Sequence, residues 1–190
     1  MKIAVLGWGS LIWDPRTLAI EGDWEDDGPR LPLEFARVSK SRLRALTLVI
    51  VEGGKPAPVL WAVSTEGNLP RARKNLKEVE DTPYLSNIGY MTASDQHSRH
   101  DTQPIRDWLK ETDFEAVIWA DFISNFEDRT KQPFTPETAI AHLEGLTKPG
   151  KVKAEEYVRR APEQIQTPLR TKLVEHFGWT YQADWSGTTS

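Results

Sequence analysis

The chain has 190 residues and a formal net charge of −4, with 38% hydrophobic and 27% charged residues. This length and composition are typical of one soluble globular domain with a sizeable core. The weak negative charge argues against a nucleic-acid-binding protein, which normally carries a basic face. No apolar run approaches the roughly 20 residues that span a bilayer, so we expect no membrane partner.

Cysteine is absent from the sequence, which excludes disulfides, thiol nucleophiles and cysteine metal sites. The N-terminal apolar run, residues 3–6, is too short for a secretion signal, so we expect a cytoplasmic protein. Eight tryptophans are a high count for this length. They fit a packed core and its rim, and their excess would also suit a self-association face, as in a homodimer.

Strands dominate the elements predicted for the first half of the chain. Residues 3–6 form an apolar run that stops at Gly7, which indicates a buried strand ending in a special turn. The acidic stretch 21–30 contains glycine and proline and predicts an exposed loop. Two β-rich runs, 45–51 and 59–63, flank a Gly-Gly turn and predict a hairpin. Further strands are predicted at residues 33–38, 88–92 and 116–122.

Helices dominate the second half. The first helix is predicted to begin after Asn68, which can cap it, and to end before Pro83. Pro70 lies in its first turn, and three apolar residues at helical spacing share one face. Other helices are predicted at residues 104–110, 135–145, 152–160 and 167–178. We therefore expect an α+β domain over residues 1–182, with a mixed sheet or small β-barrel, flanking helices and a flexible tail at 183–190.

The segment after the first strand is the first candidate for chemistry. Two glycines bracket Trp8, and Ser10 follows. Glycine permits close approach of a ligand, and successive backbone N–H groups in such a turn can bind an anion such as a carboxylate. The alternative is a tight strand-exit turn without a ligand, because short Gly-x-Gly runs are common.

Residues 7–15 read Gly-Trp-Gly-Ser-Leu-Ile-Trp-Asp-Pro. They resemble the Gly-Tyr-Gly-Ser-Leu-Ile-Trp signature near the N-terminus of the ChaC-type γ-glutamylcyclotransferases, with Trp8 in place of the usual tyrosine. The wider superfamily, which includes AIG2-like proteins, keeps a shorter Tyr-Gly-Ser core. The resemblance covers roughly the first half of the chain and implies a γ-glutamylcyclotransferase-like fold. It also implies that substrate is bound by Gly7, Trp8, Gly9, Ser10 and Leu11.

The resemblance further implies a glutamate that acts as general acid and base shortly before a Gly-Tyr pair. Here Glu80 is the first candidate and Glu78 the second, and the pair ends at Tyr90, which is assigned to substrate binding. Acidic side chains are unfavourable near a helix C-terminus, where the helix dipole is negative, so a functional reason would explain one of them. A solvated acidic helix end is the alternative. Arg37, with Arg42, is a candidate clamp for a second carboxylate.

The implied reaction converts a γ-glutamyl amine or peptide to 5-oxoproline and the free amine. The α-amine attacks its own γ-carbonyl, so holding the substrate in a folded geometry lowers the entropic barrier. This chemistry needs no metal or cofactor, and we expect none; the expected partner is a small γ-glutamyl or related amide substrate. Two alternatives stay open, a non-catalytic small-ligand-binding module on the same fold and an amide hydrolase.

Two other polar features are assigned to structure. His97 and His100 have no third ligand close by in the sequence, so no zinc site is predicted. Asp121 follows a buried strand and could face a cleft or cap the next turn, and we expect the cap.

Overall fold

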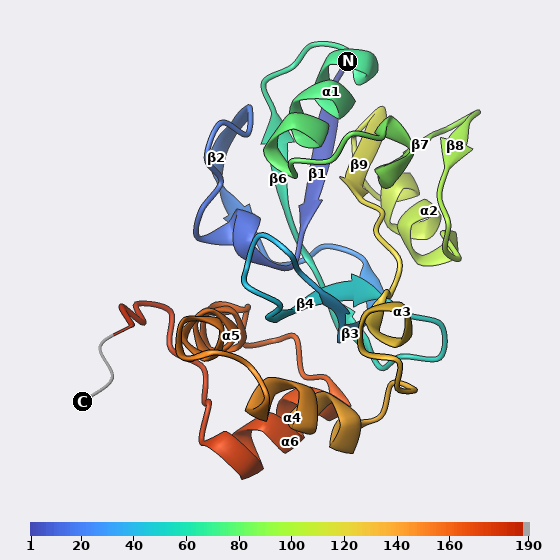
Figure 1. The fold of residues 1–190 in the computed structure, drawn as a ribbon. Coiled ribbons are helices and arrows are strands. Elements are labelled where there is room, and N and C mark those ends of the chain that lie inside the picture. Colours follow the sequence, from blue (N-terminus) through green and yellow to red (C-terminus); the bar gives the residue numbers. More distant parts are fainter. Residues whose placement is uncertain (188–190) are drawn as a thin grey trace. The chain divides into compact units, whose positions relative to one another are not determined.

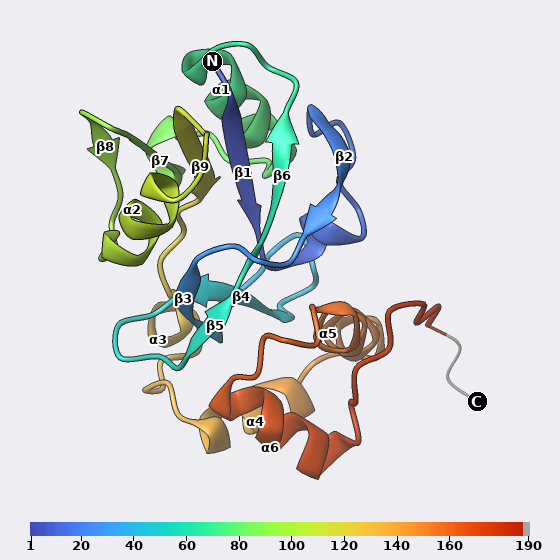
Figure 2. The same ribbon diagram turned by 180° about the vertical axis from the view of Figure 1, so that it is seen from behind.

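The computed structural model describes residues 1–187, which divide into two compact units, each built from separate stretches of the chain. Unit 1 comprises Met1–Leu31 and Pro58–Phe122, and unit 2 comprises Pro32–Ala57 and the chain from Ile123 onward. Figures 1 and 2 show the ribbon from opposite sides. The α+β expectation holds, with mixed pairing and flanking helices; no barrel closes within residues 1–187.

Unit 1 is built on a six-stranded mixed sheet with the order β2-β6-β1-β9-β7-β8. β1 pairs parallel with β9 and antiparallel with β6, and β7 is antiparallel to both β9 and β8. The strands are β1 (Ile3–Gly7), β2 (Ile20–Glu25), β6 (Leu60–Ser64), β7 (Ile88–Thr92), β8 (Gln96–His97) and β9 (Ala116–Ala120). The helices are α1 (Leu69–Val79) and α2 (Gln103–Lys110), with short 3₁₀ turns η1 (Ser10–Ile12) and η2 (Leu85–Asn87).

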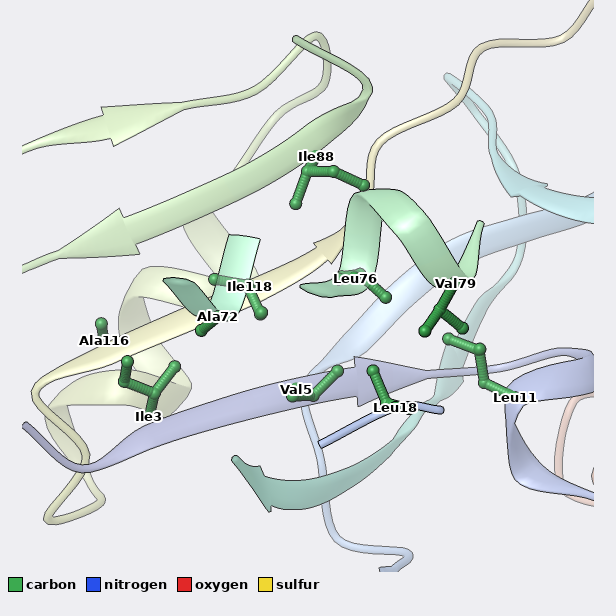
Figure 3. Packing of buried hydrophobic residues seen from close by; sticks show 10 residues of the cluster. All are labelled: Ile3, Val5, Leu11, Leu18, Ala72, Leu76, Val79, Ile88, Ala116 and Ile118. Atoms are coloured by element: carbon green, nitrogen blue, oxygen red, sulfur yellow. The ribbon is translucent and has the colours of Figure 1, made fainter. Parts of the chain in front are cut away.

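Helix α1 covers one face of this sheet. It begins where the Asn68 side chain accepts the Arg71 N–H at 3.0 Å, with proline in the first turn, which confirms the predicted helix start. Because strand side chains alternate between faces, Ile3 and Val5 point to the same side and pack against α1 (Figure 3). The buried cluster comprises Ile3, Val5, Leu11, Leu18, Ala72, Leu76, Val79, Ile88, Ala116 and Ile118.

Helix α2 covers the opposite face. Trp61 of β6 pairs with Leu6 of β1, which alternates with Val5 and so points away from α1. The Trp61 ring lies 6.1 Å from that of Trp108 on α2 and 5.0 Å from that of Phe114, between ring centroids. Three aromatic rings therefore join α2 to the sheet.

Unit 2 combines a three-stranded sheet, in the order β4-β3-β5, with four helices. Helix α4 contacts both α5 and α6, and α5 contacts β4. The Tyr157 ring of α5 meets the Phe35 ring of β3 edge to face, 6.2 Å between centroids. The elements are β3 (Arg30–Val38), β4 (Leu46–Ile50), β5 (Pro56–Pro58), α3 (Phe126–Thr130), α4 (Pro136–Glu144), α5 (Lys148–Arg160) and α6 (Pro168–Phe177).

The chain after α6 includes the stretch predicted as a flexible tail. The Gln182 N–H donates to the Arg159 carbonyl at 2.8 Å, and a turn follows in which the Trp185 N–H donates back to the Gln182 carbonyl at 3.3 Å. Residues 188–190 of the predicted tail lie outside the described residues.

The predicted hairpin between residues 45–51 and 59–63 is wrong. β4 pairs with β3, whereas β6 pairs with β1 and β2 in the other sheet. The Gly-Gly turn does form, but the chain then enters β5 on the far side of β3. A turn signal shows where a chain reverses and leaves open which strand it pairs with.

The predicted loop at 21–30 is wrong over its first half, which forms the edge strand β2. Ile20 and Trp24 are partly buried against the unit 1 core and give this strand an apolar anchor. Gly22 adopts φ +74°, and the register with β6 shifts nearby. The acidic residues and the glycine on the solvent side of this strand gave the stretch the composition of a loop, so the strand was not predicted.

Candidate functional site

The loop of residues 7–11 leaves the end of β1 and runs into η1. The Ile12 N–H donates to the Gly9 carbonyl at 3.0 Å, and the Asp14 N–H donates to the Ser10 carbonyl at 2.8 Å. In the described part of the chain, the N–H groups of Gly9, Ser10 and Leu11 find no acceptor, as expected at the start of a short helical turn. Successive N–H groups of this kind are the donors that an anionic oxygen requires.

Gly7 is explained by packing. A Cβ built on Gly7 would lie 2.6 Å from the Trp24 ring and 2.8 Å from Cδ1 of Ile12. No side chain fits there without displacing both neighbours. The glycine therefore lets β1 end directly beneath Trp24, whether or not a ligand binds the loop.

The side chains of the loop differ in accessibility. Trp8 is 6% exposed and belongs to the core, and Leu11 is buried in the cluster beneath α1. Ser10 is half-buried. Of the five loop residues predicted to bind substrate, Ser10 is the one whose side chain is open to solvent, so the loop offers mainly backbone groups to a ligand.

Helix α1 ends beside this loop. Val79, in its last turn, and Leu11 belong to the same buried cluster, and Figure 3 shows their side chains next to each other. Glu80 follows Val79 as the C-terminal cap, and its N–H donates to the Leu76 carbonyl at 2.9 Å. The end of α1 and the 7–11 loop therefore lie at the same end of unit 1.

The two candidate glutamates have different surroundings. Glu78 points to solvent, with its side chain 59% exposed and 3.8 Å from Nζ of Lys74 in an ordinary i,i+4 pair. Glu80 is half-buried. A partly desolvated carboxyl is the better proton-transfer group of the two, so the structure favours Glu80 over Glu78.

Tyr90 lies on β7, away from the loop. It pairs with Ile118, which in turn pairs with Val5, so it sits two strands from β1 and level with the middle of that strand. Its hydroxyl donates to Asp95 at 2.7 Å, and this bond raises the pKa of the Tyr90 hydroxyl. The ring is stacked near His97, 6.4 Å between centroids. The hydroxyl and the ring of Tyr90 are therefore in contact with Asp95 and His97.

Arg37 and Arg42 belong to unit 2. Nη1 of Arg37, on β3, donates to the Ile123 carbonyl at 3.4 Å. The Arg42 guanidinium lies 5.2 Å from the centroid of the Tyr157 ring. The clamp role of Arg37 stays a prediction from the resemblance.

Sequence reasoning did not predict two sets of polar contacts in unit 1, and the first is centred on Asp121. This carboxylate is fully buried and accepts bonds from the Trp119 indole at 3.0 Å, the Arg99 N–H at 2.7 Å and the Ser98 hydroxyl at 3.1 Å. Gly89 faces Trp119 so closely that a Cβ would lie 2.3 Å from the ring. Asp121 therefore anchors the segment before α2, and the expected cap of the next turn is wrong, because its carboxylate bonds Ser98, Arg99 and Trp119 instead.

The second set of contacts is centred on Arg73 of α1. Its Nη2 donates to the carbonyls of Leu85 and Ile88, at 3.3 and 3.0 Å. Its guanidinium lies over the Tyr90 ring, 4.3 Å from the centroid. The available sequence signal was its spacing of seven residues from Glu80, which places both on one side of the helix.

Both histidines noted in the sequence bind main-chain carbonyls. Nε2 of His97 lies 3.0 Å from the Ser86 oxygen, and Nε2 of His100 lies 3.3 Å from the Phe122 oxygen. Across residues 1–187, no three His, Asp or Glu side chains gather where they could hold a metal ion. Within the same range, no helix has the length and apolar character needed to cross a membrane.

Comparison with protein-family models, with curated proteins and with solved structures finds no match to this chain. The site therefore stands on its own geometry. It combines unpaired backbone donors with a half-buried carboxyl at one end of unit 1, which suits binding of an anionic group close to a proton-transfer residue.

Proposed function

We propose that this chain is a γ-glutamylcyclotransferase-like enzyme of the cytoplasm, with the fold of that superfamily. It would cyclise a small γ-glutamyl amine or peptide to 5-oxoproline. The observation that carries the proposal is the placement of Glu80 and the 7–11 loop at one end of unit 1, since Val79 and Leu11 share a buried cluster. The resemblance of residues 7–15 supplies the substrate class.

Glu80 is the proposed general acid and base. It takes a proton from the α-ammonium group of the substrate, and the freed amine attacks the γ-carbonyl carbon to form the ring C–N bond. The bond to the leaving amine then breaks as Glu80 returns the proton to that nitrogen, and the ring nitrogen passes its second proton to the released amine, which leaves as an ammonium ion. All atoms of the substrate are recovered in 5-oxoproline and the released amine, so no other reactant is needed.

The 7–11 loop is proposed to hold the negative oxygen. The N–H groups of Gly9, Ser10 and Leu11 would donate either to the substrate carboxylate or to the oxyanion that develops on the γ-carbonyl. Backbone donors are fixed in place before the reaction, and each such donor is typically worth about 10²–10³ in rate. Trp8 would support the loop from the core.

Turnover tests the proposal directly. The purified full-length protein is given a panel of γ-glutamyl amino acids, γ-glutamyl peptides and γ-glutamyl amines, and 5-oxoproline is measured. We expect product from at least one class. Absence of product above background from all of them would refute the enzyme and favour a binding module, whereas free glutamate, heavier than 5-oxoproline by one water, would show an amide hydrolase.

Glu80→Gln tests the assigned residue, with Glu78→Gln as its matched control on the same helix. Removing the proton-transfer group is expected to lower kcat by about 10²–10⁴-fold. Glu78 is exposed and paired with Lys74, so its variant should keep wild-type turnover. If Glu80→Gln keeps full activity, the assignment of Glu80 is wrong.

A further inference from the structure

The connection between α1 and β7, residues 80–88, begins at Glu80 and is tied to itself. The Thr82 N–H donates to the Lys77 carbonyl at 3.3 Å, which closes the last turn of the helix. The Asn87 side chain donates to the Thr82 hydroxyl at 2.5 Å, and the Asn87 N–H donates to the Tyr84 carbonyl at 3.1 Å. The two ends of the connection are therefore linked through Asn87.

A second set of contacts holds the connection from the side of the sheet edge. Nη2 of Arg99 donates to the Ser86 hydroxyl at 3.2 Å, and the His97 ring bonds the Ser86 carbonyl. The Asp121 N–H donates to the Asn87 carbonyl at 2.8 Å. These contacts fix the connection to β8 and to the residues that directly follow β8 and β9, but none of them reaches α1.

Arg73 supplies the contact from α1. Within residues 1–187, it is the one side chain of this helix that donates to the connection, through Nη2 to the carbonyls of Leu85 and Ile88. Its Nε is buried without a hydrogen-bond partner in the described chain. The guanidinium is oriented by carbonyls and by the Tyr90 ring, and no carboxylate of residues 1–187 forms an ion pair with it. Its placement thus serves the connection rather than a surface salt bridge.

The turn that carries Glu80 needs such support. Asp81 adopts φ +47°, in the left-handed region that few residues other than glycine occupy. A backbone of this kind persists when its surroundings hold it. Seven residues separate Arg73 from Glu80, which is two helical turns, or about 10.5 Å along the axis. Arg73 contacts Leu85, Ile88 and Tyr90, so an effect of Arg73 on Glu80 would pass through the connection.

We propose that Arg73 is a positioning residue for Glu80. The inference rests on the proposed function for its effect on turnover. By bonding the carbonyls of Leu85 and Ile88, Arg73 holds the connection that begins at Glu80 against α1. This keeps the Glu80 carboxyl level with the 7–11 loop. Arg73 touches neither the loop nor the reacting atoms, so its loss slows proton transfer and leaves substrate binding nearly intact.

Kinetics of Arg73→Met, Arg73→Lys and the control Arg71→Met test this role. Arg71 lies on the same helix, 70% exposed and paired with Glu66. Because a displacement of about 1 Å can cost 10²-fold, Arg73→Met is expected to lower kcat at least about tenfold, with KM changed less than about twofold. Arg73→Lys keeps the charge and should retain intermediate turnover, and Arg71→Met should match wild type. An unchanged kcat in Arg73→Met, or a rise in KM alone, overturns the proposal.

Amide hydrogen exchange gives a readout that does not require a substrate. The N–H groups of Asn87 and Asp121, which donate within or onto the connection, should exchange faster in Arg73→Met than in Arg71→Met. Equal protection in the two variants overturns the positioning role, even if the γ-glutamyl panel yields no product and the proposed function fails. Should Arg73→Met not fold, the same comparison is made with Arg73→Lys.

Discussion

Each unit has an arginine that binds main-chain carbonyls, but the two guanidinium groups differ in burial and in how many of these bonds they make. In unit 2, Arg170 of α6 is 2% exposed and in unit 1 Arg73 is half-buried, and both donate to main-chain carbonyls. Arg170 fills four acceptors at 2.7–3.1 Å, those of Val158, Ala161, Pro162 and Ile165. Arg73 fills two and leaves Nε without a partner. Burying an unpaired donor costs free energy, so Arg170 is the better satisfied of the two guanidinium groups.

The difference separates stability from positioning. Arg170 completes the C-terminal end of α5, where helix carbonyls have no partners within the helix. Arg73 ties a loop to the helix that carries the proposed catalytic carboxyl. We therefore expect variants of Arg170 to act mainly on unfolding and variants of Arg73 mainly on kcat.

Arg170→Met should give the largest loss of stability. It leaves buried carbonyls unpaired, and breaking a buried charged network typically costs about 3–5 kcal/mol. The free energy of unfolding from urea titration measures the loss, with Arg71→Met as an exposed control expected to change it by less than about 0.5 kcal/mol. A loss below about 1 kcal/mol for Arg170→Met would remove the contrast between the two arginines.

The N-terminal caps of two helices allow the same comparison between the units, with smaller expected losses in the free energy of unfolding. Thr167 caps α6 and is 1% exposed; its hydroxyl accepts the Arg170 N–H at 3.1 Å and donates to the buried Glu34 carboxyl at 2.6 Å. Asn68 caps α1 at the surface with one bond. We expect losses of about 2 kcal/mol for Thr167→Ala and about 1 kcal/mol for Asn68→Ala in thermal or urea unfolding. Equal losses would show that burial of the Thr167 hydroxyl adds nothing.

The smallest expected effect is a pH dependence in unit 2. Burial lowers the pKa of His142, whose Nε2 lies 2.9 Å from the Arg44 carbonyl. Since the pKa is lower in the folded state, the neutral ring contributes its full stability above the unfolded value, near pH 6.5. That contribution is lost as the pH falls through the folded-state pKa.

Urea titrations between pH 8 and pH 5 compare wild type with His142→Gln. We expect wild type to lose up to about 1 kcal/mol more than this variant over the range, a modest figure because the ring is only half-buried. His176→Gln serves as control, since His176 is exposed and paired with Glu144. Parallel pH curves for wild type and His142→Gln would contradict the lowered pKa.

Elements with local signals could be predicted from the sequence. Helix α1 could be predicted from Asn68 and Pro70, and α6 from Thr167 and the glycine at its end, because helix caps and helix breakers act within one turn. Pairing between strands depends on distant partners, and the hairpin prediction failed for that reason. Strand β2 was missed because its anchor, Trp24, packs against a core assembled from other segments.

The candidate site likewise contains parts with local sequence signals and parts that depend on distant partners. The 7–11 loop is contiguous and follows a clear strand, so its position could be predicted from the order of residues. The role of Arg73 and the partners of Asp121 could not be predicted, because the main-chain groups and side chains that they bind are brought close only by the fold. Glu80 was the first candidate and Glu78 the second from the sequence, and the burial at the end of the folded helix favours the same residue.

The interleaving of the two units has a consequence for synthesis. Unit 1 takes its central parallel pair from β1 and β9, which lie more than 100 residues apart along the chain. Between these two strands the ribosome releases residues 32–57, which belong to unit 2. The helices of unit 2 are synthesised last. Neither core can be completed from a continuous stretch as it emerges. Long-range pairing of this kind slows folding and prolongs exposure of unpaired strands, so the six-stranded sheet of unit 1 cannot be completed until β9 has been synthesised.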